Sequence, residues 1–222
     1  MQRAMPRCLR PVRRIGRMRH RLHAEHAGPL RREDLQVARE GAAGAQGDGV
    51  MRGRVWKLGD DIDTNQLAPG QTPEMLGLSG AAAREHLVRG CLSAIRPGLA
   101  ALVRPGDILV AGRNFGQGSH RERANTAVIE MGFAAVVAES LARLFFRNSV
   151  AFGAPAIECP GIAALVEEGD RLEIDLAAGR LHNLDRGGAL DFAPPTPTVR
   201  DILAAGGMLA LLRQRLGPAA DE

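Results

Sequence analysis

The stretch ILVAGRNFGQGSHRERANTAVIEMGFAAVVA, residues 108–138, decides the fold of this chain. It begins with an apolar run (108–111) typical of a buried strand, continues through a loop of small and polar residues (112–118), and ends in a second apolar run (133–138). Between them, four apolar residues recur on one helix face before Gly132: Ala124, Ala127, Val128 and Met131. Strand, loop, helix and strand within about thirty residues predict a βαβ unit with parallel strands and a right-handed crossover.

Further short elements are expected on both sides of this unit. They are a strand at 55–58, a loop at 64–80, a helix at 81–92, a helix at 140–150 and a strand at 155–159. In the helix at 140–150 we expect one stripe, formed by Leu141, Leu144, Phe145 and Asn148.

The pattern changes after residue 170. Residues 171–176 alternate polar and apolar, and Ala178-Gly179 turns the chain into residues 180–184, which predicts a half-solvated hairpin. Two short helices, 198–205 and 208–216, are expected on either side of Gly206-Gly207. The fold class is therefore α/β, with a central βαβ unit and a late antiparallel hairpin.

Composition narrows the class of protein. The 222 residues are 45% hydrophobic and 24% charged, as in one soluble globular domain with or without a tail. The three cysteines, Cys8, Cys91 and Cys159, lie far apart, which argues against a disulfide framework and against a zinc site with close ligand spacing. No apolar run approaches the roughly 18 residues of a membrane span.

The net charge of +4 is distributed unevenly. Residues 1–50 hold eleven Arg and five acidic residues, whereas residues 51–222 hold eighteen basic and twenty acidic residues. The basic excess therefore belongs to the first fifty residues, and the rest of the chain is mildly acidic.

Three interpretations of residues 1–50 compete. Clustered Arg would suit a nucleic-acid-binding arm, although the segment has no aromatic residue to stack on bases. A transit peptide would be Arg-rich, but this segment contains neither Ser nor Thr. The third interpretation, a disordered or non-native upstream extension, is our expectation, with one domain at 51–222. Of 29 basic residues 28 are Arg, as in GC-rich genomes, where reading frames often extend upstream of the true start.

The loop GRNFGQGSHRE, residues 112–122, carries the chemistry. Its three glycines, Gly112, Gly116 and Gly118, let the backbone turn sharply and approach a ligand closely. A Walker phosphate loop would need a Lys followed by Ser or Thr, and a dinucleotide site would need a different glycine spacing. Neither motif is present, so nucleotide binding is not expected.

Two interpretations apply to the end of this loop. Ser119 and Glu122 have the spacing of a capping box, so they would simply satisfy free helix amides. Alternatively, Ser119, His120 and Arg121 surround a helix N-terminus, where amides and the helix dipole favour a carboxylate or a developing anion. Arg121 is a two-pronged donor suited to a carboxylate.

These motifs resemble the small subunits of 3-isopropylmalate dehydratase, the swivel-domain partners of the aconitase family. The loop is similar to the signature G-x-N-F-G-x-G-S-S-R-E, and residues 51–67 (MRGRVWKLGDDIDTNQL) resemble the family's opening around G-D-N-I-D-T-D-x-I. Residues 104–112, 138–153, 168–176 and 202–211 match further family segments in order. The resemblance covers residues 51 to about 216 and implies an aconitase-type swivelling β/β/α domain.

The resemblance also implies a division of labour. A separate large subunit would carry a 4Fe–4S cluster that acts as a Lewis acid on the substrate hydroxyl, so this chain would bind no cofactor or metal itself. Ser119 falls on the catalytic serine, the general base for a carbon-bound proton, and Arg121 on the arginine that binds a substrate carboxylate. The implied protein is a cytoplasmic hydro-lyase subunit in leucine biosynthesis, inactive alone, with no membrane partner.

Departures from the family pattern fall on substrate-facing positions. His120 replaces the second serine and could contact the substrate or be a surface residue. Thr64 lies in a D-T-D motif that reads D-T-N here, and it could contact the substrate or simply be a turn residue. Gln71 and Thr72 stand where relatives have a loop that contacts the substrate's side group, so the resemblance implies that these two residues contact the substrate. The resemblance implies a 2-hydroxy di- or tricarboxylate as substrate, either 2-isopropylmalate or a relative such as dimethylmalate, homoaconitate or methylcitrate, and these departures leave the choice among them open. A non-catalytic protein that binds nucleic acid through its basic arm is the alternative of another class.

Overall fold

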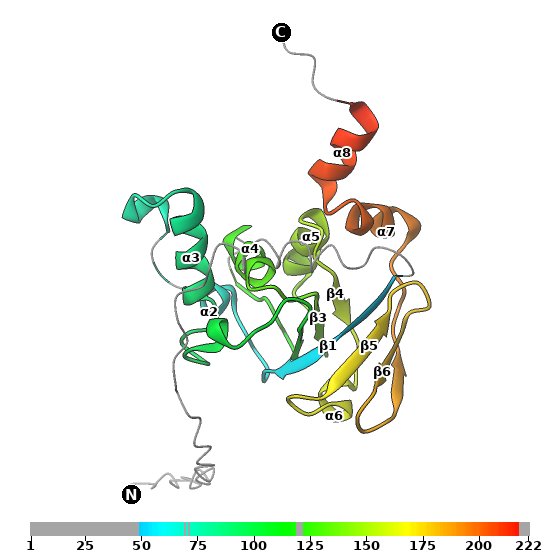
Figure 1. Ribbon diagram of the computed structural model, residues 1–222. Helices are drawn as coiled ribbons and strands as arrows, with labels where there is room; N and C mark the ends of the chain where they lie inside the picture. The colour runs from blue at the N-terminus through cyan, green and yellow to red at the C-terminus, as the bar shows by residue number, and fades with distance from the viewer. Residues whose placement is uncertain (1–48, 69, 71, 119–121, 218–222) are drawn as a thin grey trace, which may run out of the picture.

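A mixed β-sheet with helices on both faces forms the body of the protein (Figure 1). The computed structural model describes residues 49–68, 70, 72–118 and 122–217. In this part of the chain the sheet has seven strands, in the order β4-β3-β2-β1-β5-β6-β7. They are β1 (Val50–Lys57), β2 (Ile108–Ala111), β3 (Ala135–Ala138), β4 (Ala156–Glu158), β5 (Arg171–Asp175), β6 (Arg180–Asn183) and β7 (Ala189–Asp191).

The helices are short. They are α2 (Thr64–Leu67), α3 (Gly80–Gly90), α4 (Glu122–Glu130), α5 (Arg143–Ala151), α6 (Ile162–Leu165), α7 (Pro197–Ala204) and α8 (Met208–Leu216). Two 3₁₀ turns, η1 (Glu74–Leu76) and η2 (Leu99–Ala101), complete the described elements. None of the described helices is long and apolar enough to cross a membrane.

Strand β1 joins the parallel and antiparallel halves of the sheet. Its second half pairs parallel with β2, with Val55 opposite Ile108. Its first half pairs antiparallel with β5, with Met51 opposite Ile174. The strand predicted at 55–58 was therefore too short, because the polar and glycine residues at 52–54 hide the pairing with β5.

The predicted βαβ unit is confirmed as β2–α4–β3. The two strands are parallel, and the four residues expected on the inner face of the helix are all buried: Ala124, Ala127, Val128 and Met131. Gly132 follows the helix with a φ of 95°, a left-handed conformation that glycine adopts without strain.

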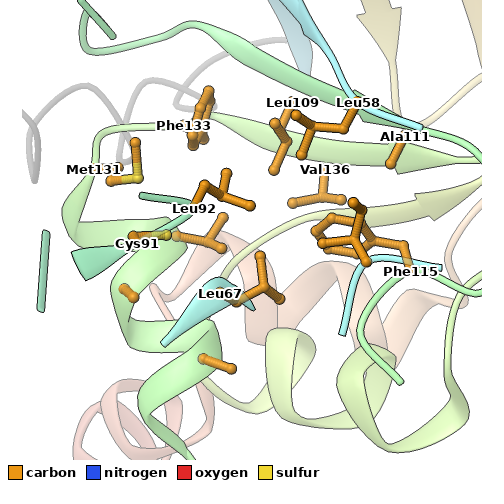
Figure 2. Packing of buried hydrophobic residues seen from close by; sticks show 14 of the residues in the cluster. Leu58, Leu67, Cys91, Leu92, Leu109, Ala111, Phe115, Met131, Phe133 and Val136 are labelled. Atoms are coloured by element: carbon orange, nitrogen blue, oxygen red, sulfur yellow. The ribbon is translucent and has the colours of Figure 1, made fainter. Parts of the chain in front are cut away.

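The core lies on both faces of the parallel half of the sheet. Alternate residues of β2 point to opposite faces, so Leu109 belongs to one buried cluster and Ile108 to the other. The first cluster contains Leu67, Phe115 and Val136 and fills the space between the sheet and α2–α5 (Figure 2). Burial of both faces explains why β2 and β3 read as continuous apolar runs.

The helix expected at 140–150 begins later in the sequence and buries other residues than predicted. Helix α5 starts at Arg143, and its buried residues are Phe145, Ser149 and Val150, whereas Leu144 is 45% exposed. The apolar stripe predicted through Leu144 is therefore wrong. The reason is that residues 140–142 form hydrogen bonds with the loop at 112–118 instead of a helical turn.

The expected loop at 64–80 is also partly wrong, because it contains α2 and η1. A capping box starts α2: the Asp63 carboxylate accepts from the amides of Asn65 and Gln66, both at 2.8 Å, and the Gln66 side chain accepts from the Asp63 amide at 2.8 Å.

The late hairpin is confirmed as β5–β6, and β7 extends it into a three-stranded antiparallel unit.

Candidate functional site

The loop at 112–118 lies at the carboxyl end of the parallel strands. It follows β2 directly, and the segments that follow β1 and β3, residues 59–64 and 139–142, lie on either side of it. Ligands of open α/β sheets bind at this edge, where the strand connections diverge. The fold therefore brings three separate parts of the sequence to one place.

Residues 59–64 lie alongside the loop, and a regular series of backbone hydrogen bonds joins the two segments. The amide of Gly112 donates to the Gly59 carbonyl at 3.0 Å, and the amide of Thr64 donates to the Gln117 carbonyl at 2.8 Å. Between these ends, the amide of Gly116 donates to the Ile62 carbonyl at 2.7 Å. The two segments are thus held in a fixed register along their length.

Two aspartates reinforce this pairing with their side chains. The Asp60 carboxylate accepts from the amide of Arg113 at 2.7 Å, and the Asp61 carboxylate accepts from the side-chain amide of Asn114 at 2.9 Å. Asp61 and Asn114 both have a left-handed backbone, with φ values of 58° and 60°. Such conformations cost free energy in a residue with a side chain, and they cluster at sites whose geometry the surrounding structure imposes.

The other side of the loop is fixed by the segment after β3 and by the core. The Ser140 hydroxyl accepts from the amide of Asn114 at 2.9 Å, and the Ser140 carbonyl accepts from the amide of Phe115 at 3.1 Å. Phe115 is fully buried and meets Phe145 of α5 edge to face, with ring centroids 5.1 Å apart. The loop is therefore anchored by the hydrophobic core as well as by the segments on both sides of it.

The three predicted glycines are required by close packing against protein atoms. A Cβ at Gly112 would lie 1.9 Å from an Asp60 carboxylate oxygen, and one at Gly116 would lie 2.3 Å from Phe145 Cγ. A Cβ at Gly118, whose φ is 111°, would lie 2.8 Å from the Thr64 hydroxyl oxygen.

The predicted site residues fall into two groups. Thr64 is buried and lies against Gly118, so the structure brings it to the end of the loop. Glu122 is the first residue of α4. Ser119, His120 and Arg121, together with Gln71, lie outside the described residues, and so does the capping box expected between Ser119 and Glu122.

Thr72 lies two residues before the turn η1 and forms a hydrogen bond with it. Its hydroxyl accepts from the amide of Met75 at 3.1 Å. The pKa of Glu74 is held below its ordinary value by a hydrogen bond from its own backbone amide, with smaller contributions from Thr72 and from the positive charge of Arg123.

Several contributors to the site were missed at the sequence level: Asp60, Asp61, Asn114 and Ser140. A usable signal was present, because polar residues follow directly after the strands that become β1 and β3. Carboxyl ends of parallel strands meet at one edge of a sheet, so these polar groups had to converge there.

The described residues do not suit an iron–sulfur cluster or another metal ion. No group of three or more His, Cys, Asp or Glu side chains in the described part of the chain could hold a metal ion. Cys91 and Cys159 are buried in different core clusters, and burial raises the pKa of both thiols, that of Cys159 to about 11. A metal ligand has to be a thiolate, which such burial disfavours.

Known proteins share both the sequence and the fold. Residues 101–160 match the family described as the Aconitase C-terminal domain. The chain is 42% identical over 178 residues to 3-isopropylmalate dehydratase small subunit 1 of Methanopyrus kandleri, which covers 78% of this chain and 98% of that protein. It is 40% identical over 162 residues to the methanogen homoaconitase small subunit of Methanothermobacter thermautotrophicus, covering 73% of this chain and 90% of that one.

The crystal structure of 3-isopropylmalate dehydratase from Methanocaldococcus jannaschii superposes with a TM-score of 0.67. It is 34% identical in sequence, and the match covers 75% of this chain and 95% of that one. Fold and loop together define the class, an aconitase-type swivel domain with an anchored glycine loop at the carboxyl edge of its sheet. Within that class, the chain belongs to the family of 3-isopropylmalate dehydratase small subunits, which are hydro-lyase subunits.

Proposed function

We propose that this chain is the small subunit of a cytoplasmic hydro-lyase that converts 2-isopropylmalate to 3-isopropylmalate, by dehydration and rehydration, in leucine biosynthesis. The observation that supports this proposal most is the anchored loop at 112–118, which leads directly into the serine–histidine–arginine sequence at 119–121. A group that removes a proton from carbon needs a fixed position relative to its substrate. The hydrogen bonds on both sides of the loop would supply such a position.

Ser119 is the proposed general base for the carbon-bound proton, and Arg121 the proposed ligand of a substrate carboxylate. Negative charge develops on that carboxylate as the proton leaves, and a guanidinium fork with helix-start amides stabilises it. Rehydration uses the same groups in reverse, returning a proton to the neighbouring carbon. His120, Thr64, Gln71 and Thr72 are the proposed contacts to the remainder of the substrate.

The large subunit is the proposed partner, and it would hold the 4Fe–4S cluster. That cluster would supply a Lewis acid for the substrate hydroxyl. The relatives named small subunits support a large partner.

The relatives also favour a second candidate substrate class. One is named isopropylmalate/citramalate isomerase small subunit, from Methanocaldococcus jannaschii, 37% identical over 167 residues. Another is the homoaconitase small subunit described above. Citramalate- or homocitrate-like acids are therefore the alternative substrates for the same chemistry.

The test is reconstitution of the 222-residue chain with its large subunit, with 2-isopropylmalate, citramalate and homocitrate offered separately and products followed by NMR. We expect turnover of 2-isopropylmalate and none by either subunit alone. Ser119→Ala should lower kcat by about a thousandfold, in the range of a lost general base. Ser79→Ala is the matched control, because Ser79 is exposed and makes no side-chain capping bond. A near-normal rate for Ser119→Ala would refute the base assignment, and turnover of another acid alone would refute the substrate.

A further inference from the structure

A cavity of about 460 Å³ lies on the side of α5 that faces away from the glycine loop. Phe146 and Val150 of α5 line it, whereas Phe145, which contacts Phe115 of the loop, lies on the opposite side of the helix. None of residues 112–118 lines the cavity. The reaction proposed for the glycine loop therefore leaves this cavity without a role.

Three parts of the chain form its walls: α5, the edge strand β4, and residues 192–199, which lead into α7 and begin it. Ala156 and Ile157 of β4 both line the cavity although they belong to the core clusters on opposite faces of the sheet. A space that touches both must lie beyond the outer edge of the strand. Helix α7 packs against α5 beside this edge (Figure 1). The cavity is therefore bounded by the edge of the sheet and by two helices.

The surroundings of β4 do not suit the addition of another strand. The strand has three residues, with Pro155 directly before it and Pro160 two residues after it. Pro194 and Pro195 line the cavity as well. Proline has no backbone N–H to donate, and it protects sheet edges against pairing. The volume of the cavity lies in the range of small-molecule sites, so a small molecule is the better occupant.

The interior of the cavity is mostly apolar. Its lining includes Val150, Ile157, Leu176 and Phe192, which are all buried. Phe146 also lines it and remains 39% exposed, so an apolar ligand would remove part of this ring from water. These walls suit an aliphatic chain.

Two positive charges stand in the same lining. Arg143 and Arg147 are four residues apart on α5, and within the described part of the chain neither guanidinium has an ion pair. Like charges at this spacing destabilise a helix, and an anion bound to both would remove the repulsion. A guanidinium fork fits the two oxygens of a carboxylate.

Glu158 is the acidic residue of the lining, and it does not neutralise these arginines. Its carboxylate accepts from the amide of Leu141 at 3.2 Å, and no ion pair joins it to Arg143 or Arg147. Two guanidinium groups and one carboxylate leave an excess of positive charge at the cavity. The cavity therefore combines an apolar interior with charges that attract an anion.

We propose that this cavity is a binding site for a small aliphatic carboxylate. Arg143 and Arg147 hold the carboxylate, and the aliphatic chain lies beside β4, between Val150 and Phe192. The site uses no residue of the glycine loop, so the proposal stands independently of the reaction proposed above.

The test is calorimetric titration of the full 222-residue chain with octanoate, compared with hexanoate, octylammonium and acetate. Octanoate should bind about tenfold more tightly than hexanoate, because two further methylene groups leave water. Octylammonium has the same chain with the opposite charge and should bind at least tenfold more weakly, and acetate should show no measurable binding. Absence of octanoate binding, or equal affinity for octylammonium, would overturn the proposal.

Two variants test the charge and the cavity separately. Arg143→Gln with Arg147→Gln should weaken octanoate binding at least tenfold, because both charged donors are lost. Val199→Phe keeps both arginines but fills part of the cavity, and it should also weaken binding at least tenfold. Octanoate binding at the parent affinity in either variant would overturn the proposal.

Arg200→Gln with Arg213→Gln is the matched control for the arginine pair. It removes the same charge from exposed positions on α7 and α8 outside the lining, so the affinity should not change. An equal loss in this control would reduce the effect to net charge and overturn the assignment of the two lining arginines.

The position of the ligand and the competing occupants are tested by NMR and by reconstitution. Nuclear Overhauser effects should join the octanoate chain to the methyl groups of Val199 and Leu203, whereas contacts only with the exposed Leu209 and Leu212 of α8 would overturn the proposal. The complex with the large subunit should bind octanoate with the same affinity. Loss of binding in that complex would assign the cavity to the large subunit, and affinity that falls as the protein concentration rises would assign it to a second copy.

Discussion

The side-chain amide of Asn114 donates to the carboxylate of Asp61 at 2.9 Å, and both residues hold left-handed backbone conformations. The two residues are 53 positions apart in the sequence. Their contact joins the segment after β1 to the glycine loop after β2. Each strained residue is thus held by a hydrogen bond to the other.

This contact predicts different effects for two substitutions at one position. Asp61→Ala should lower the free energy of unfolding by about 2 kcal/mol, from one lost hydrogen bond and a left-handed residue without a stabilising side chain. Asp61→Asn should cost less than about 1 kcal/mol, because asparagine keeps an acceptor oxygen and tolerates this conformation. Denaturant titration followed by Trp56 fluorescence measures both values, since Trp56 is the single tryptophan and is buried. Equal losses would show that neither an acceptor oxygen at residue 61 nor the tolerance of asparagine for this backbone conformation adds stability.

Gly116 tests whether the loop can move away from the core. Gly116→Ala combines a φ of 80° with a Cβ 2.3 Å from Phe145 Cγ, so we expect a loss above about 3 kcal/mol. Gly77→Ala is the matched control: its φ is 68°, but nothing lies within 4 Å, and about 1 kcal/mol should be lost. The same titration compares them. Similar losses would mean that the loop shifts freely and is not anchored.

Local patterns predicted the βαβ unit and the loop, because both depend on neighbours along the chain. The spacing of Ala124, Ala127 and Val128 is a property of one helix, and it was sufficient to predict the buried face of α4. The contact of Thr64 with Gly118 is different, because it joins segments more than fifty residues apart. Only the sheet order brings those segments together, so no local period could reveal it.

The two errors, in the buried face of α5 and at the start of α2, have different causes. Leu144 has the right spacing for a buried stripe, but the start of α5 is delayed because the Ser140 carbonyl accepts from the amide of Phe115 and the amide of Ala142 donates to the Phe115 carbonyl. The capping box at Asp63 and Gln66 was a local signal that went unread, because Asp replaces the more familiar Ser or Thr.

The buried thiols predict a loss of stability in alkali. Burial, with smaller contributions from Glu139 and Asp191, raises the pKa of Cys159 to about 11 from an ordinary value of 9.0, and burial also raises the pKa of Cys91. The native state therefore keeps protons that the unfolded state releases, so stability should fall as the pH rises from about 9 to about 11. The slope is at most about 1.4 kcal/mol per pH unit for each thiol.

Few other side chains titrate between pH 9 and pH 11, because the chain has one Lys and no Tyr. Denaturant titrations at pH 8 and 10.5 measure the loss, and Cys159→Ala should reduce it. In a Cys8→Ser background, a thiol reagent at pH 8 should label neither cysteine in the native chain and both after unfolding. Rapid native labelling would contradict the burial of these thiols.

Arg121 offers a test of substrate binding that depends on geometry and leaves the charge unchanged. Arg121→Lys keeps one positive charge but loses the fork that holds both oxygens of a carboxylate. In the reconstituted complex, we expect kcat/KM to fall by ten- to a hundredfold, consistent with the loss of about 1.4 to 2.7 kcal/mol of transition-state stabilisation. A rise in KM alone would place the contact in the ground state, whereas a fall in kcat would indicate that the fork acts as charge builds on the carboxylate. Arg200→Lys on α7 is the control, because Arg200 is exposed and lies outside the glycine loop. Unchanged kinetics for Arg121→Lys, with the control also unchanged, would exclude Arg121 as the carboxylate ligand.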